Sequence, residues 1–214
     1  MHAKKRLFLM ALIGLFLCVS GTSGESIRVR FVFDGDTISL ENGETVRYIG
    51  IDAPEIDHGT HEGEYMADAA RNFNQKCLAD EHAVLERGGD VRDRYGRLLG
   101  YIFLTTGPMV NELLVAKGLA VVSTQPPNTK YQSRLLRAQQ QAMKARAGIW
   151  RRLPEKEHRR YVGNKRSYRF HTTDCPFGKR ISKTNRIPLN SLRDAFWRGY
   201  SPCKTCQPAA ILKK

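Results

Sequence analysis

The strongest constraint on the fold is the stretch DGDTISLENGETVRYIGIDAPE, residues 34–55. ISL and TVRYIGI have the apolar patterning of half-buried strands, and Asn42-Gly43 between them is a strong signal for a tight hairpin turn. Pairing the two strands would bring Asp36, at the start of the first, near Asp52, at the end of the second. The sequence therefore predicts two carboxylates that converge at one end of a hairpin.

Two converging carboxylates predict a site for a hard cation. Ca²⁺ takes about six to eight oxygen ligands from carboxylates, backbone carbonyls and water. Two aspartates leave coordination positions open for water and for a phosphate oxygen, so such a site would suit phosphodiester chemistry. Each residue alone also fits an ordinary turn or a surface charge, and it is their order and spacing that carry the hypothesis.

The other periodic segments predict a mainly β protein with helices. Alternating or apolar runs predict further strands over residues 26–33, 82–88 and 97–104. Apolar residues at helical spacing predict helices over about residues 63–79, 109–118 and 129–148. The third helix is expected to open on a capping box at Thr129. Five short strands with inserted helices fit a small closed or nearly closed barrel.

These motifs resemble the staphylococcal nuclease (thermonuclease) family. The resemblance lies in DGDT, in RYIGIDAPE, in DRYGR at residues 93–97 and in GIW at residues 148–150, and it covers about residues 26–150. It implies a five-stranded OB-type barrel with three helices. It also implies a calcium-dependent phosphodiesterase, an endonuclease of the micrococcal-nuclease type, that hydrolyses DNA and RNA to give 3′-phosphate ends.

The resemblance further implies roles for single residues. The implied calcium ligands are Asp36, Asp52 and the backbone carbonyl of Ala53. The implied catalytic residues are Arg47, Glu55 and Arg97. Glu55 would accept a proton from the attacking water, and the two arginines would donate to phosphoryl oxygens as negative charge grows there. Tyr95 would contact a phosphate of the bound nucleotide.

The N-terminus, residues 1–24, has the layout of a secretory signal peptide. Three cations precede an apolar or small run from Leu7 to Val19, which small residues follow. That run is shorter than the roughly 20 residues that span a membrane. We therefore expect an exported protein, periplasmic or secreted, without stable membrane insertion after signal cleavage. An uncleaved anchor, or lipidation of Cys18, remains an alternative.

The formal net charge of +14 is concentrated in the C-terminal tail. Residues 25–153 hold 17 Lys and Arg and 17 Asp and Glu, whereas residues 154–214 hold fifteen and four. A basic tail beside a neutral body predicts that attachment to a polyanion resides in the tail. Its cations are interleaved with aromatic residues, Tyr161, Tyr168, Phe170 and Phe177, as in a nucleic-acid surface, although a plain solvated face would also be basic.

The tail also carries two close pairs of metal-ligand residues. His171-x3-Cys175 and Cys203-x2-Cys206 would form a closed Cys3His site, an arrangement that structural zinc prefers. The segments FHTTDCP and GYSPCKTCQP resemble the Ada-type metal-binding domain, with His171 where that domain has its first cysteine. A disulfide is the alternative, because an exported protein meets oxidising conditions, but the odd number of tail cysteines makes complete pairing awkward.

We expect four segments: a signal peptide (1–24), a nuclease OB-fold domain (25–153), a linker (154–160) and a basic zinc-binding domain (161–214). The predicted function is an exported calcium-dependent nuclease whose tail anchors DNA and RNA, with zinc as a structural cofactor. The alternative is a non-catalytic nucleic-acid-binding or DNA-capture protein on a nuclease-like barrel. We expect a monomer.

Overall fold

The computed structural model describes residues 24–57, 59, 62–80, 82–157 and 159–213. The predicted signal peptide, apart from Gly24, lies outside these residues and stays a prediction. Across the described ranges, no helix has both the length and the hydrophobicity that crossing a membrane requires.

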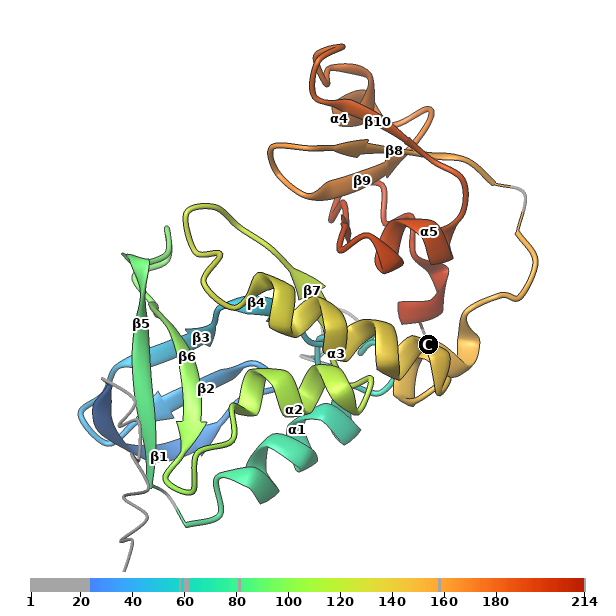
Figure 1. Ribbon diagram of the computed structural model, residues 1–214. Coiled ribbons are helices and arrows are strands. Elements are labelled where there is room, and N and C mark those ends of the chain that lie inside the picture. The colour runs from blue at the N-terminus through green and yellow to red at the C-terminus, as the bar shows by residue number, and fades with distance from the viewer. Residues whose placement is uncertain (1–23, 58, 60–61, 81, 158, 214) are drawn as a thin grey trace, which may run out of the picture.

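Five strands form a closed barrel, which confirms the predicted OB-type fold (Figure 1). In spatial order they are β1 (Glu25–Val32), β2 (Thr37–Leu40), β3 (Thr45–Tyr48), β6 (Leu98–Leu104) and β5 (His82–Arg92). β5 pairs with β1 to close the barrel, and β3 and β6 are its parallel pair. The barrel interior is filled by alternate apolar residues of these strands, such as Ile38, Val46 and Ile102, which are fully buried.

The predicted hairpin is present, but its second strand is shorter than expected. Thr37 pairs with Arg47, and Gly43 supplies the positive φ of 84° that the turn requires. The chain then turns at Gly50, where φ is 79°, and β4 (Gly50–Asp52) leaves the barrel to pair with β7 (Val121–Ser123). TVRYIGI is therefore two strands in two different sheets, and β7 is a strand that sequence patterning did not predict.

Three helices lie beside one another against the barrel, as expected (Figure 1). They are α1 (Ala67–Cys77), α2 (Val110–Ala116) and α3 (Gln132–Lys144). The predicted capping box at Thr129 is wrong, because α3 begins after Tyr131 without a side-chain cap. The Thr129 carbonyl instead accepts a turn hydrogen bond from the Gln132 N–H at 3.0 Å. After α3 ends, a 3₁₀ turn, η1 (Gly148–Arg152), carries the GIW motif.

Residues 161–213, called the C-terminal module below, form a separate four-stranded sheet with short helices. The strand order is β10 (Arg186–Leu189), β8 (Tyr161–Asn164), β9 (Arg169–Thr172) and β11 (Ser201–Pro202). The helices are α4 (Pro176–Lys179), α5 (Leu192–Trp197) and the 3₁₀ turn η2 (Ala210–Leu212). Ser191 Oγ accepts the Asp194 N–H at 3.0 Å and so caps the N-terminus of α5.

A second apolar core joins the C-terminal module to α3 and η1. Trp150 of η1 meets the ring of Phe196 edge-on at 5.0 Å, and Phe196 meets Phe170 at 5.4 Å. Gln139 of α3 accepts the Val122 N–H at 2.7 Å and donates to the Phe196 carbonyl at 2.6 Å. Because all these groups are buried, α3, β7 and α5 are held together by packing and by satisfied hydrogen bonds.

Replacing Phe196 by alanine is expected to destabilise the whole protein by about 3–5 kcal/mol, since a fully buried ring would leave a cavity between Trp150 and Phe170. Chemical denaturation measures the free energy of unfolding. Phe177→Ala is the matched control because its ring is 47% exposed. Equal losses in the two variants would contradict a shared core.

Candidate functional site

Arg47 on β3 bridges the two carboxylates that the hairpin was predicted to bring together. Its Nη1 lies 2.8 Å from Asp36 Oδ2 and its Nη2 lies 2.8 Å from Asp52 Oδ1. The same guanidinium donates to the carbonyls of Tyr48 and Ile51 at 3.2 and 3.1 Å. Because the chain turns between β3 and β4, these carbonyls and the Asp52 side chain point toward Arg47. All three charged side chains are largely buried.

The turn before β2 fixes Asp36. Its Oδ2 accepts the Ala53 N–H at 2.6 Å, and its Oδ1 accepts the Thr37 hydroxyl at 3.1 Å. Asp34 Oδ1 accepts the Asp36 N–H at 2.8 Å, as in an Asx turn. A Cβ on Gly35 would lie 2.6 Å from the Ala53 Cβ, so DGD needs its glycine for this close approach. The close approach brings the Ala53 N–H to Asp36 Oδ2, the hydrogen bond given above.

Asn74 on α1 holds the DGD turn from the other side. Its Nδ2 donates to the carbonyl of Asp34 at 3.2 Å, and its Oδ1 accepts the Tyr48 hydroxyl at 3.0 Å. Sequence reasoning missed this residue. The available signal was an asparagine at helical spacing from Ala67 and Ala70, the other buried positions of α1.

Asn74→Ala is expected to lower the free energy of unfolding by about 1–3 kcal/mol, because buried polar partners, including the Tyr48 hydroxyl, would lose their hydrogen bonds. Thermal and chemical denaturation measure this loss. Gln75→Ala, on the exposed face of the same helix, is the control. A loss no larger than that of the control would show that Asn74 does not support the turn.

The electrostatics of the site are dominated by an excess of carboxylates. Burial raises the pKa of Asp36 well above its usual range; Arg47 opposes this, and the charges of Asp34 and Asp52 add to it. For Arg47, the neighbouring aspartates outweigh burial and raise its pKa, so the guanidinium stays charged. A buried, crowded carboxylate of this kind favours a further cation nearby.

Glu55 lies at the open edge of this cluster, beside a second glutamate that sequence reasoning missed. The Glu55 N–H donates to Glu64 Oε2 at 3.0 Å, and the Glu64 N–H donates to the Glu55 carbonyl at 2.8 Å. Burial raises the pKa of Glu64. The Glu55 side chain is 55% exposed, so its carboxylate faces solvent at the mouth of the site.

Lys204 of the C-terminal module reaches the same carboxylates. Its Nζ lies 3.2 Å from Asp52 Oδ2 and 3.4 Å from Glu55 Oε1. A small pocket of about 60 Å³ separates the two parts of the chain here, and Asp52, Glu64 and Lys204 line it. Sequence reasoning also missed Lys204, since only the fold brings residue 204 to residue 52.

Arg97 and Tyr95 lie in the turn between β5 and β6. In the part of the chain that the structure describes, Arg97 forms an ion pair with Asp93, at 2.8 Å, within this turn. The Tyr95 ring is 68% exposed, and the Arg97 guanidinium lies 5.5 Å from its centre. The parallel pairing of Val46 with Leu98 places Arg97 next to β3, the strand that carries Arg47.

The donor set at Asp36 and Asp52, with Glu55 at its edge, suits a divalent cation. It offers carboxylate oxygens, which hard cations prefer, and its net negative charge is only partly offset by Arg47. The Lys204 ammonium between Asp52 and Glu55 stands in for such a cation.

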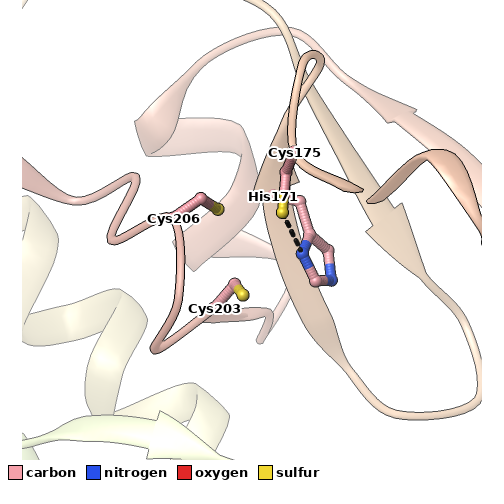
Figure 2. Close-up of side chains that lie close together, drawn as sticks. All are labelled: His171, Cys175, Cys203 and Cys206. Atoms are coloured by element: carbon pink, nitrogen blue, oxygen red, sulfur yellow. Dashed lines mark hydrogen bonds between the residues drawn. The ribbon is translucent and has the colours of Figure 1, made fainter. Parts of the chain in front are cut away.

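The second candidate metal centre is the predicted Cys3His group, whose side chains converge on one point (Figure 2). The ligand atoms of His171, Cys175, Cys203 and Cys206 all lie within 4.8 Å of one another. Zn–S and Zn–N bonds of about 2.3 and 2.0 Å place tetrahedral ligands at such separations. His171 comes from β9, Cys175 precedes α4, and the last two cysteines follow β11.

The chemistry of this group also suits a metal. The described residues include four cysteines, all with free thiols: Cys77, Cys175, Cys203 and Cys206. Among them there is no disulfide bond of the kind that the alternative reading predicted. Burial lowers the pKa of His171, with Arg169 adding to the effect, which favours the neutral imidazole that binds metals. Burial acts to raise the pKa of Cys203, but N–H groups of Cys206 and Thr205 outweigh it and lower the pKa.

The aromatic part of the predicted nucleic-acid surface is partly wrong. Tyr161 and Phe170 are buried in the core of the C-terminal module, so they cannot stack on bases. Phe177 is 47% exposed, with the Arg180 guanidinium 4.7 Å from its ring centre. Arg186 donates to the carbonyls of Gly178 and Lys179, where it supports the end of α4. The alternation of basic and aromatic residues in this segment therefore reflects the alternation of exposed and buried side chains along a strand.

Comparison with known proteins finds matches over the part of the chain that forms the barrel. Residues 45–152 match the family model described as staphylococcal nuclease homologue. The thermonuclease of Staphylococcus intermedius is 39% identical over 132 residues, which cover 60% of this chain and 78% of that protein. The thermonuclease of Staphylococcus hyicus is 35% identical over 135 residues, 62% and 79% of the two chains. Endonuclease YncB of Bacillus subtilis is 37% identical over 122 residues, 55% and 57% of the two chains.

The chain therefore belongs to the staphylococcal nuclease homologue family.

Proposed function

We propose that this protein is an exported, calcium-dependent endonuclease that hydrolyses DNA and RNA to give 3′-phosphate ends. The observation that carries the proposal is the Asp36–Arg47–Asp52 cluster at the end of a closed barrel, with Glu55 at its solvent edge. Two relatives named thermonuclease and one named endonuclease support the same reaction class.

The proposed roles are those that the family resemblance implies, and burial and charge support them. Asp36, Asp52 and the Ala53 carbonyl would hold Ca²⁺, which when bound would draw in a phosphate oxygen and offset developing negative charge. Glu55 has the exposure that a general base needs to meet water, and its backbone is fixed by Glu64.

The two arginines and Tyr95 complete the proposed site. Arg47 and Arg97 would donate to the phosphoryl oxygens as charge builds in the transition state, a forked contact that lysine cannot reproduce. Arg47 is already charged and held by two carboxylates, whereas Arg97 would have to divide its donors between Asp93 and the phosphate. The exposed Tyr95 would contact a terminal phosphate.

The C-terminal module is proposed to bind one structural Zn²⁺ through His171, Cys175, Cys203 and Cys206 and to anchor nucleic acid through its excess of cations. Zinc is supported by the soft, buried donor set and the spacing of its atoms. Anchoring is supported by charge, since residues 154–214 hold fifteen cations and four acids. We further propose a monomer, divided into a nuclease domain (25–153), a linker (154–160) and a zinc-binding domain (161–214).

The reaction is tested by digesting plasmid and single-stranded DNA with the purified mature protein, with Ca²⁺, with Mg²⁺ alone and with a calcium-selective chelator. We expect cleavage that requires Ca²⁺ and leaves 3′-phosphates. A folded protein that binds DNA but cleaves under none of these conditions would overturn the proposal. That result would favour a non-catalytic DNA-binding or DNA-capture protein whose basic tail is the functional part.

A further inference from the structure

Lys204 is the contact between the two candidate metal centres. It lies between Cys203 and Cys206, and its side chain crosses from the C-terminal module to Asp52 and Glu55. The sequence separation is about 150 residues, so this contact depends on the packing of the module on α3 and η1.

The backbone around Lys204 is held on both sides. Before it, the Cys203 N–H donates to the Phe170 carbonyl at 2.9 Å and the short strand β11 pairs with β9. After it, the Gln207 N–H donates to the Cys203 carbonyl at 3.0 Å and closes the Cys203–Cys206 turn. The lysine stem therefore starts from a fixed point and only its side chain is free to move.

The ammonium occupies oxygens that a divalent cation would use. It lies within 3.4 Å of both oxygens of Asp52, at 3.3 Å from Oδ1 and 3.2 Å from Oδ2, and also reaches Glu55. A divalent cation bound to these oxygens would repel the Lys204 ammonium at such short range, so the two compete for them. The Lys204 side chain is 61% exposed and can swing away into solvent.

We propose that Lys204 is a tethered cation of the nuclease site, which neutralises Asp52 and Glu55 before a divalent cation binds and thereby weakens the affinity of the site for that cation. The proposal rests on the divalent-cation site proposed above. It gives the C-terminal module a direct part in that site, separate from anchoring nucleic acid.

The proposal is tested by titrating the purified mature protein with Ca²⁺ in a calorimeter, without nucleic acid. Lys204→Ala is expected to bind Ca²⁺ about 2- to 10-fold more tightly than the wild type, because two partly exposed ion pairs no longer have to be broken. Lys204→Arg keeps the charge and is expected to stay close to the wild type. Circular dichroism of each variant verifies its fold.

Lys213→Ala is the matched control. Lys213 lines the same pocket but is not a partner of Asp52 or Glu55, so its loss changes the net charge without removing these ion pairs. Equal affinities in Lys204→Ala and the wild type, or equal tightening in Lys213→Ala, would overturn the proposal and leave the calcium site standing. A wild-type protein that binds no Ca²⁺ would overturn both.

Discussion

A Glu55→Gln variant is expected to cleave DNA about 100- to 10,000-fold more slowly than the wild type while keeping its fold. That range is the usual contribution of a general base, and the amide cannot accept the proton that an attacking water must lose. The change is nearly isosteric, and among the described residues the side chain pairs with Lys204 in an exposed contact. Turnover on single-stranded DNA at saturating Ca²⁺ measures the effect, and thermal denaturation verifies the fold.

Two variants sharpen this test. Glu41→Gln removes another exposed carboxylate, one that pairs with Arg28 away from the cluster, and is expected to leave turnover unchanged. Arg97→Ala is expected to lose orders of magnitude in turnover as well, through loss of a phosphate donor. Near-normal activity in both Glu55→Gln and Arg97→Ala would refute the proposed mechanism.

Cys203→Ser is expected to abolish stoichiometric zinc binding and to unfold much of the C-terminal module. Structural zinc contributes about 10–16 kcal/mol of apparent binding free energy in zinc-finger peptides, and a module of this size has a small core of its own. Metal analysis of the wild type should give close to one zinc per chain. Hydrogen exchange should show lost protection in β8 and β9 of the variant.

Cys77→Ser is the control for this substitution. Cys77 is a half-buried thiol on α1, in the barrel part of the chain, and its replacement is expected to keep zinc at the wild-type level. Intact disulfides and no metal in the wild-type protein would reject the zinc proposal.

The sequence predicted the barrel and the hairpin because both depend on local signals. The alternation of β1, the Asn42-Gly43 turn and the apolar runs of β5 and β6 are each readable within ten residues or so. The break of TVRYIGI after Tyr48 was not predictable in this way. It depends on β7, some 70 residues away, which supplies the partner for Gly50–Asp52.

The same distinction holds for the candidate site. The predicted pairing brought Asp36 near Asp52, and the structure places both beside Arg47, although Asp52 lies on β4, outside the β2–β3 hairpin. Glu64 and Lys204 approach through a loop and through the packing of the C-terminal module, and neither has a local signature. The Cys3His group is intermediate between a locally predictable site and one that depends on the fold. Its two ligand pairs can be recognised from their spacing in the sequence, but only the fold brings the pairs together.

The second core has a consequence for any shortened form of the protein. Ile149 and Trp150 belong to the barrel part of the chain, yet they are fully buried beneath α5 and its neighbours. In a chain ending at residue 153, these side chains would form one contiguous apolar patch exposed to water. Exposed apolar patches promote self-association. We therefore expect the truncated protein to aggregate and not to stay monodisperse.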